Sequence, residues 1–291
     1  MNNRLPPWFR QKPADTATIS NVKNLLDGLS LHTICESALC PNTGECLSRR
    51  TATFLILGDT CTRHCTFCAV KKGAPAPVDA SEPGNLLEAV QELGLNYTII
   101  TSVTRDDLPD GGASNFAAVI SLLCENIKNV VIEVLIPDFL GSTGALKTVV
   151  NARPQVINHN VETVPRLYPK VRPEADYSRS VELLAMVKEL NPATVTKSGL
   201  IIGLGETKEE VIELMSDLRE ADCDLLTIGQ YLQPSHRHHP VIRYVPPEEF
   251  SEYATIGKDM GFIDIASAPL VRSSYKAAEM YEKAKSRPAQ T

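Results

Sequence analysis

The chain has 291 residues, of which 43% are hydrophobic and 22% are charged, so it can bury a large core in one domain or in two. Its formal net charge of −6 and its pI near 5.6 argue against general nucleic-acid binding, which needs an excess of Lys and Arg. No run of 18 apolar residues occurs, so no membrane-spanning helix is predicted.

The first 15 residues are rich in proline and polar side chains, and we expect an extended, unpacked arm there. From Thr16 to Leu31, apolar residues recur at helical spacing. This predicted helix leads into two groups of cysteines. An upstream group is spaced C-x4-C-x5-C and a downstream group C-x3-C-x2-C, so six of the eight cysteines fall within 34 residues: Cys35, Cys40 and Cys46, then Cys61, Cys65 and Cys68.

Each group offers three thiolates where a tetrahedral zinc or a cubane iron–sulfur cluster takes four ligands. A fourth position filled by something else is therefore implied. Disulfides are disfavoured in a chain of this length without an apolar signal segment, and a zinc ribbon needs two C-x2-C pairs where only Cys65 and Cys68 form one. Reduced, grouped thiols fit a cytoplasmic location, or an organelle matrix in a eukaryote. Cys124 and Cys223 lie in apolar helical stretches and are interpreted as core residues.

Beyond the cysteines, short apolar runs alternate with amphipathic stretches. The runs predict strands at 53–57, 97–103, 130–136, 156–159, 198–204 and 225–232. The stretches predict helices at 86–95, 116–127, 146–151, 181–190 and 211–220. This repeat indicates an α/β fold with a parallel sheet, wound either as a complete or partial barrel or as an open doubly wound sheet.

Ligands of parallel α/β folds gather at the carboxyl ends of the strands, and the downstream cysteines directly follow the first predicted strand. Polar residues follow the other strands and are expected to face the same mouth: Thr101, Ser102, Thr104, Arg105, Asp106, Asp107, Asn158, His159, Asn160, Glu162, Gly203, Gly205, Glu206, Gln230, Tyr231 and Gln233. We interpret Asp106, Asp107 and Asp110 as loop structure or ribose contacts, and His236, His238 and His239 as solvated.

Five basic residues flank the downstream cysteines: Arg49, Arg50, Arg63, Lys71 and Lys72. They form either a solvated surface or a patch that attracts an anionic ligand or an acidic partner. The sequence leaves this choice open.

A C-x3-C-x-aromatic-C loop after the first strand, with Phe67 as the aromatic residue, resembles the signature of the radical S-adenosylmethionine enzymes. Together with the upstream cysteines and the segment RSSY at 272–275, the chain resembles one family among them, the lipoyl synthases. The similarity runs from about residue 20 to 280 and includes GDTCTRHCTFCAV, TSVTRDDLPDGGA, NHNVET, KSGLIIGLGET, QYLQPS and RYVPPEEF. Biotin synthases lack the upstream cysteines and RSSY.

The resemblance implies a partial (β/α)6 TIM-type barrel at 51–240, an N-terminal extension at 1–50 carrying the upstream cysteines, and a C-terminal extension at 241–291 carrying RSSY. The downstream cysteines would hold a four-iron four-sulfur cluster that binds S-adenosylmethionine. The upstream cysteines would hold an auxiliary cluster, with Ser274, or Ser273 if the register is off by one, as its fourth ligand. Cys61, Cys65, Cys68 and Ser274 would then be the catalytic residues.

The activity implied is insertion of two sulfur atoms, at C6 and C8, into an octanoyl chain on a lysine of a carrier protein. The auxiliary cluster would donate the sulfur, and each sulfur would consume one S-adenosylmethionine. We expect cofactor contacts from Phe67, Thr101, Ser102, Asn160, Glu162, Lys197, Gly203 and Gln230.

The implied partners are an octanoylated lipoyl domain of a 2-oxoacid dehydrogenase E2 subunit or the glycine-cleavage H protein, and a low-potential electron donor. Neither a nucleic acid nor a membrane is expected. An alternative from another class is an iron–sulfur electron-transfer or cluster-carrier protein. Such a protein would not release 5′-deoxyadenosine from S-adenosylmethionine.

Overall fold

The computed structural model describes residues 5–10 and 15–286. Eight strands form the main sheet in the order β1-β2-β5-β6-β7-β8-β9-β10. β1 is antiparallel to β2, and every later pair of neighbours is parallel. The bounds are β1 His32–Thr33, β2 Thr53–Ile56, β5 Tyr97–Ser102, β6 Val131–Leu135, β7 Val156–Asn158, β8 Val195–Ile202, β9 Leu225–Gln230 and β10 Asp264–Ser267.

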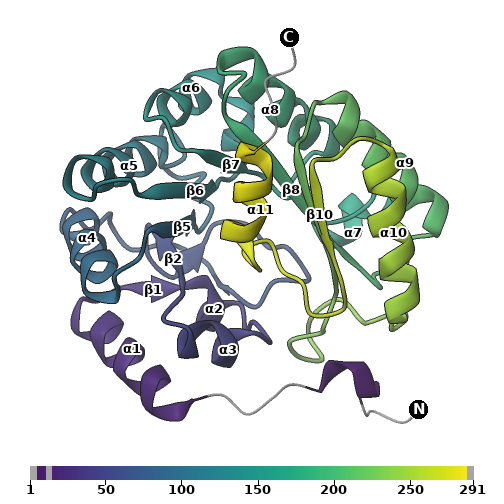
Figure 1. Ribbon diagram of the computed structural model, residues 1–291, viewed down its shortest axis with the longest axis horizontal. Coiled ribbons are helices and arrows are strands. Elements are labelled where there is room, and N and C mark those ends of the chain that lie inside the picture. The colour runs from purple at the N-terminus through teal and green to yellow at the C-terminus, as the bar shows by residue number, and fades with distance from the viewer. Residues whose placement is uncertain (1–4, 11–14, 287–291) are drawn as a thin grey trace.

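Long helices surround this sheet, while the last helix lies in the middle of the ring (Figure 1). The long helices are α1 Thr16–Gly28, α4 Glu82–Leu93, α5 Ala113–Asn126, α6 Thr143–Asn151, α8 Tyr177–Leu190, α9 Lys208–Glu220, α10 Pro247–Asp259 and α11 Ala277–Lys285. Short helical segments are η1 Pro7–Phe9, α2 Ile34–Ser37, α3 Thr43–Ser48, η2 Phe139–Gly141, η3 Pro165–Leu167 and α7 Tyr168–Val171. A separate pair of short strands, β3 Thr60–Cys61 and β4 Lys71–Lys72, lies outside the main sheet.

The arrangement is a partial TIM-type barrel, so the doubly wound alternative is wrong. The six predicted strands correspond to β2, β5, β6, β7, β8 and β9, and the six predicted helices to α1, α4, α5, α6, α8 and α9. The sequence analysis missed β10, which extends the parallel sheet, and the helices α10 and α11. No helix in the described ranges has the length and apolarity to cross a membrane.

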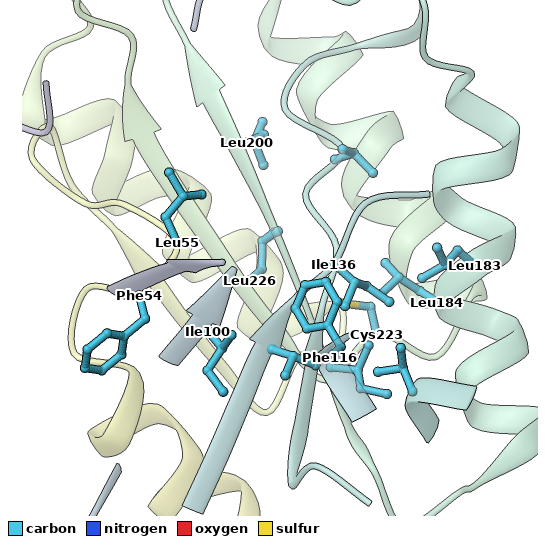
Figure 2. Packing of buried hydrophobic residues seen from close by; sticks show 14 of the residues in the cluster. Phe54, Leu55, Ile100, Phe116, Ile136, Leu183, Leu184, Leu200, Cys223 and Leu226 are labelled. Carbon is cyan, nitrogen blue, oxygen red and sulfur yellow. The ribbon is translucent and has the colours of Figure 1, made fainter. Parts of the chain in front are cut away.

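The side chains of β2 show how the strands separate the core from the site. Phe54 and Leu55 point to opposite sides of the strand (Figure 2). Both are buried in the main hydrophobic cluster, where Ile100 and Phe116 also lie, but only Leu55 of the two also lines a cavity. Successive side chains of this strand therefore face opposite sides, so that one side packs against the helices and the other forms the cavity wall.

Two predictions of packing are wrong. Residues 1–4 and 11–14 of the predicted arm lie outside the described residues, but Phe9 in η1 is buried, and its ring centroid lies 5.7 Å from that of Tyr244. Cys124 is exposed, because the buried face of α5 is formed by Phe116, Val119, Ile120 and Leu123, and Cys124 falls beside that face. Cys223 is buried, as predicted.

Candidate functional site

Both cysteine groups line one cavity of about 370 Å³ at the carboxyl ends of the barrel strands. Eight of the polar residues predicted after the strands also line it: Thr101, Ser102, Thr104, His159, Asn160, Glu162, Gln230 and Tyr231. The others from that set do not, namely Arg105, Asp106, Asp107, Asn158, Gly203, Gly205, Glu206 and Gln233. The cavity therefore brings together two groups of cysteines that are separated in the sequence by strand β2.

The downstream cysteines lie on a loop that is held by the barrel. β3 and β4 pair across the base of the loop, and its backbone is bonded to segments that follow other strands. The Thr62 amide donates to the Thr104 carbonyl at 3.0 Å, the Thr66 amide to the Val171 carbonyl at 2.9 Å, and the His64 amide to the Glu174 carboxylate at 3.1 Å.

Arg63 fixes the same loop from within. Its guanidinium is 2.7 Å from the Asp106 carboxylate and 2.6 Å from that of Asp138, and Arg179 lies 3.3 Å from Asp138 on the other side. The Arg63 side chain is only 4% exposed, so this residue does not belong to a basic surface. Lys72 is also engaged within the loop, because its ammonium donates to the Cys65 carbonyl at 2.8 Å, so the basic surface is smaller than the sequence suggests.

The upstream cysteines lie on two short helices outside the parallel barrel. Cys35 is in α2 and Cys46 in α3, with Cys40 between them. The Cys40 amide donates to the Cys35 carbonyl at 2.9 Å, and the Thr43 hydroxyl donates to the carbonyls of both residues at 2.8 Å. A long-range bond joins this region to the C-terminal part of the chain, because the Asn42 side-chain amide donates to the Leu270 carbonyl at 2.6 Å.

The segment RSSY forms a turn beside the upstream cysteines, closed by the Tyr275 amide, which donates to the Arg272 carbonyl at 2.9 Å. Ser273 and Ser274 both line the cavity. The Asn160 side-chain amide donates to the Ser273 hydroxyl at 2.7 Å. Within the described part of the chain, the Ser274 hydroxyl makes no hydrogen bond, so it is available to a ligand.

Burial makes five of the six thiols harder to ionise in the absence of a cation. Burial, followed by the neighbouring thiols, raises the pKa of Cys46 to about 12, and burial opposed by a bond from the Val70 backbone raises that of Cys68 to about 12. Burial also raises the pKa values of Cys35, Cys40 and Cys65. Bound iron reverses this preference, since it favours thiolate. Among the described residues, no group of three or more His, Cys, Asp or Glu side chains is placed to hold a single metal ion. Both cysteine groups nevertheless line the cavity, and three thiolates are a donor set that fits an iron–sulfur cluster.

Three buried polar atoms on residues of the cavity wall have no hydrogen-bond partner among the residues described: Ser102 Oγ, His159 Nε2 and Asn160 Oδ1. His159 Nδ1 lies 2.8 Å from the Ile136 carbonyl and must donate to it, which leaves Nε2 as an acceptor. Burial lowers the pKa of His159 to about 4, so the ring is neutral near pH 7. Unpartnered buried polar atoms are rare, and these fit a polar ligand.

Glu162 combines backbone strain with an unusual electrostatic setting. Its φ of +64° is a conformation that residues other than glycine seldom adopt. Burial raises the pKa of its carboxyl, while the charge of Arg172 and a hydrogen bond from Asn160 oppose the rise. The sequence analysis did not single out Arg172, whose Nη1 donates to the Asn160 and Val161 carbonyls at 3.0 and 3.2 Å. Its only signal in the sequence is a charged residue close to NHNVET.

The residues predicted to contact a cofactor divide into two sets. Phe67, Thr101, Ser102, Asn160, Glu162 and Gln230 line the cavity, whereas Lys197 and Gly203 do not. Lys197 is fully buried and forms an ion pair with Glu133 at 2.8 Å. Gly203, with φ +98°, opens a turn whose amide donates to Glu206, and Thr207 then caps α9 as part of a capping box.

The remaining polar clusters have local partners. Asp107 pairs with Arg105 at 2.8 Å, and Asp110 accepts from the Gly112 and Ser114 amides, which supports the interpretation as loop structure. His238 and His239 contact the Ser235 hydroxyl and the Leu204 carbonyl at 2.8 and 3.0 Å. Each of these two histidine rings therefore has a hydrogen-bond partner in the protein.

A profile of the Radical SAM superfamily matches residues 55–218. The chain is 56% identical over 277 residues to a lipoyl synthase of Caldanaerobacter subterraneus subsp. tengcongensis, covering 95% of this chain and 97% of that protein. It is 58% identical over 258 residues to a lipoyl synthase of Aquifex aeolicus, covering 89% and 94%.

Solved structures show the same fold at low sequence identity. SuiB of Streptococcus suis bound to its precursor peptide SuiA matches with a TM-score of 0.57 and 14% identity, over 78% of this chain and 50% of that one. Methylornithine synthase PylB matches with a TM-score of 0.50 and 14% identity, over 94% of each chain.

Proposed function

Because the chain belongs to the radical S-adenosylmethionine superfamily and, within it, to the lipoyl synthase family, we propose that it inserts sulfur at C6 and C8 of an octanoyl chain carried on a lysine of a carrier protein. The observation that carries this proposal is the single cavity shared by both cysteine groups. A substrate arm in that cavity would face both groups at once. An electron carrier has no need of such a space.

In this proposal Cys61, Cys65 and Cys68 hold the cluster at which S-adenosylmethionine binds, and Cys35, Cys40 and Cys46 hold the auxiliary cluster. When bound, the first cluster would supply the electron that cleaves S-adenosylmethionine to methionine and a 5′-deoxyadenosyl radical, and the auxiliary cluster would supply sulfide for transfer. Ser274 is the fourth ligand of the auxiliary cluster, in preference to Ser273, because the Ser273 hydroxyl already accepts from Asn160.

The chain's own contribution is to bind, orient and shield. Ser102, His159 and Asn160 offer unpartnered polar atoms to the cofactor or the substrate amide, and Phe67 lines the wall beside them. Leu55, Ile136 and Leu200 supply apolar walls suited to an alkyl chain. His159 stays neutral near pH 7 and accepts a hydrogen bond rather than donating one through Nε2.

The segments 1–50 and 241–291 act, in this proposal, as the two extensions that bring ligands to the auxiliary cluster at the mouth of the 51–240 barrel. The partners are an E2 lipoyl domain or a glycine-cleavage H protein, and a low-potential reductant. We place the reaction in the cytoplasm or an organelle matrix, since the eight cysteines, all within the described residues, form no disulfide.

Anaerobic reconstitution tests the proposal. The loaded protein should contain about eight iron and eight sulfide per chain, as two cubane clusters require. Incubation with reductant, S-adenosylmethionine and an octanoyl-lysine peptide should yield 5′-deoxyadenosine and a peptide heavier by two sulfur atoms. A peptide with unmodified lysine is the control. Two clusters without release of 5′-deoxyadenosine would instead indicate an electron-transfer or carrier protein.

A further inference from the structure

Arg272, the first residue of the RSSY turn, is a cation that lines the cavity. Its guanidinium donates to the Val271 carbonyl at 2.6 Å and, within residues 5–10 and 15–286, forms no ion pair with a carboxylate. Arg63 and Arg105, in contrast, each pair with a carboxylate at 2.8 Å or less. Arg272 is half-buried, and an unpaired charge that is partly shielded from water is costly unless something of opposite charge compensates it.

The backbone places this guanidinium firmly. A Cβ on Gly229 of β9 would lie 3.1 Å from Arg272 Nη1 and 2.1 Å from the Val271 carbonyl oxygen, so the segment packs directly on the strand. Asn42, two residues after Cys40, donates to the carbonyl of Leu270, two residues before Arg272. The Arg272 side chain and the upstream cysteines are therefore held in one assembly.

Charges around Arg272 come from two elements. On the loop after α2, Cys40 lines the same cavity as Arg272. On the segment after β7, Glu162 is the other acidic neighbour, although it forms no ion pair with Arg272. The charge of Arg172 also acts on Glu162, so this carboxylate does not compensate Arg272 alone, and the upstream cysteines would supply further negative charge once they hold a cluster.

We propose that Arg272 is the counter-charge of the auxiliary cluster and stabilises its reduced, more negative form. This inference rests on the proposed function, because it takes the auxiliary cluster as the occupant of the upstream cysteines. Net charge and nearby hydrogen bonds are among the factors that set the potentials of iron–sulfur clusters. Arg272 is accordingly a residue that adjusts the potential, while Ser274 in the same turn is a ligand.

The test uses the full chain with Cys61, Cys65 and Cys68 replaced by Ala, so that one cluster remains. Reductive titration followed by electron paramagnetic resonance is compared for this protein, for Arg272→Met and for the charge-retaining Arg272→Lys. At a fixed poise, Arg272→Met should lower the ratio of reduced to oxidised cluster tenfold or more, which is 59 mV for a one-electron couple. Arg272→Lys should stay within threefold.

A matched control carries Arg272→Met in a chain with Cys35, Cys40 and Cys46 replaced by Ala. There the remaining cluster should keep its reduced-to-oxidised ratio. An unchanged ratio for Arg272→Met on the auxiliary cluster, or equal shifts for Met and Lys, overturns the inference. Loss of iron in the Arg272→Met variant but not in Arg272→Lys supports the inference, and equal loss of iron in both variants overturns it. Absence of iron from the parent variant overturns the proposed function itself.

Discussion

The two cysteine groups share a cavity but are held in different ways. The downstream loop is bonded to the segments after β5 and β7, and Arg63 ties it to two buried or half-buried carboxylates. Around the upstream group, Thr43 bonds locally to Cys35 and Cys40, β1 pairs with β2 just before Cys35, and Asn42 links the group to Leu270. Loops of the barrel thus fix one group, whereas the other relies on one edge strand and also on docking of the C-terminal segment.

This difference matches the two proposed tasks. A cluster that binds S-adenosylmethionine must keep its geometry through every turnover, which suits a loop held by the barrel. A cluster that gives up sulfur must lose and regain atoms, which suits short helices and an oxygen ligand, since oxygen is a poorer match than thiolate for iron in a sulfide cage. The following predictions test this comparison, from the largest expected effect to the smallest.

Replacing cysteines should separate the two groups completely. Any Ala substitution of Cys61, Cys65 or Cys68 should abolish cleavage of S-adenosylmethionine, because the iron that binds it is lost. Any Ala substitution of Cys35, Cys40 or Cys46 should leave cleavage and remove sulfur transfer. Quantification of 5′-deoxyadenosine and of thiolated peptide measures both. Lipoyl product from Cys35→Ala would contradict the assignment of the sulfur donor.

Substitutions at Ser274 should separate assembly from activity. Ser274→Cys should retain full iron but lower the yield of doubly thiolated product by at least the roughly tenfold typical of changes around metal ligands. Ser274→Ala should keep most of the iron, since three thiolates remain. Iron content and product mass are the measurements.

Ser273→Ala is the matched control in the same turn, where the hydroxyl only accepts from Asn160. Ser273→Ala should reduce the yield of doubly thiolated product less than Ser274→Cys does. If the defect appeared at Ser273 alone, the ligand would be the neighbouring serine.

Asp138→Asn should lower the free energy of unfolding by about 3 kcal/mol at neutral pH, because it breaks the buried ion pair that holds the downstream loop. Burial opposes ionisation of Asp138, but the hydrogen bonds and charge of Arg63 outweigh it and lower the pKa to about 2. The stabilisation is present above the unfolded pKa near 3.9 and is lost as the pH falls through about 2. Urea unfolding at several pH values measures this.

The difference in unfolding free energy between wild type and Asp138→Asn should therefore shrink as the pH falls from about 5 to about 2. Asp107→Asn is the matched control, since Asp107 pairs with Arg105 but is 40% exposed, and it should cost less than about 1 kcal/mol. A pH-independent difference for Asp138→Asn would contradict the role given to its charge.

The smallest effect concerns the exposed basic residues near the upstream group. Arg49 and Arg50 remain on the surface, although Arg49 lies 3.5 Å from Glu45. If they steer an acidic carrier domain, Arg49→Glu with Arg50→Glu should slow association roughly tenfold at low salt, and the effect should fade as salt rises. Stopped-flow binding of an octanoylated lipoyl domain measures the rate. Equal rates at low salt would exclude this steering.

The sequence predicted the barrel strands and their covering helices because burial on a sheet leaves continuous apolar runs. β10 escaped prediction because Asp264–Ser267 is short and begins with an acidic residue that pairs with Lys283. Helix α11 escaped because only Ala277, Met280 and Ala284 mark its buried face. Short elements of this kind depend on tertiary contacts that no local pattern records.

The cysteine spacing predicted the candidate ligands, since thiolates at such intervals have few other uses in a reducing compartment. The charges around them were not predictable. Arg63 looked like surface, yet its partners Asp106 and Asp138 lie 43 and 75 residues away. Lys197 on β8 looked available, yet it forms an ion pair with Glu133 on β6, two strands away in the sheet. Burial of a charged residue is decided by distant residues, and a sequence window does not contain them.

The bond from Asn42 to Leu270 spans 228 positions, and this has a consequence for biosynthesis. The upstream cysteines leave the ribosome early, while the turn that completes their surroundings is made at the far end of translation. At about 5–20 residues per second, the interval is roughly 10 to 50 seconds. During that time the downstream cysteines can contact the segments that hold their loop, but the C-terminal turn that lies beside the upstream thiols has not yet been made. The surroundings of the upstream cysteines are therefore complete only after the whole chain has been made.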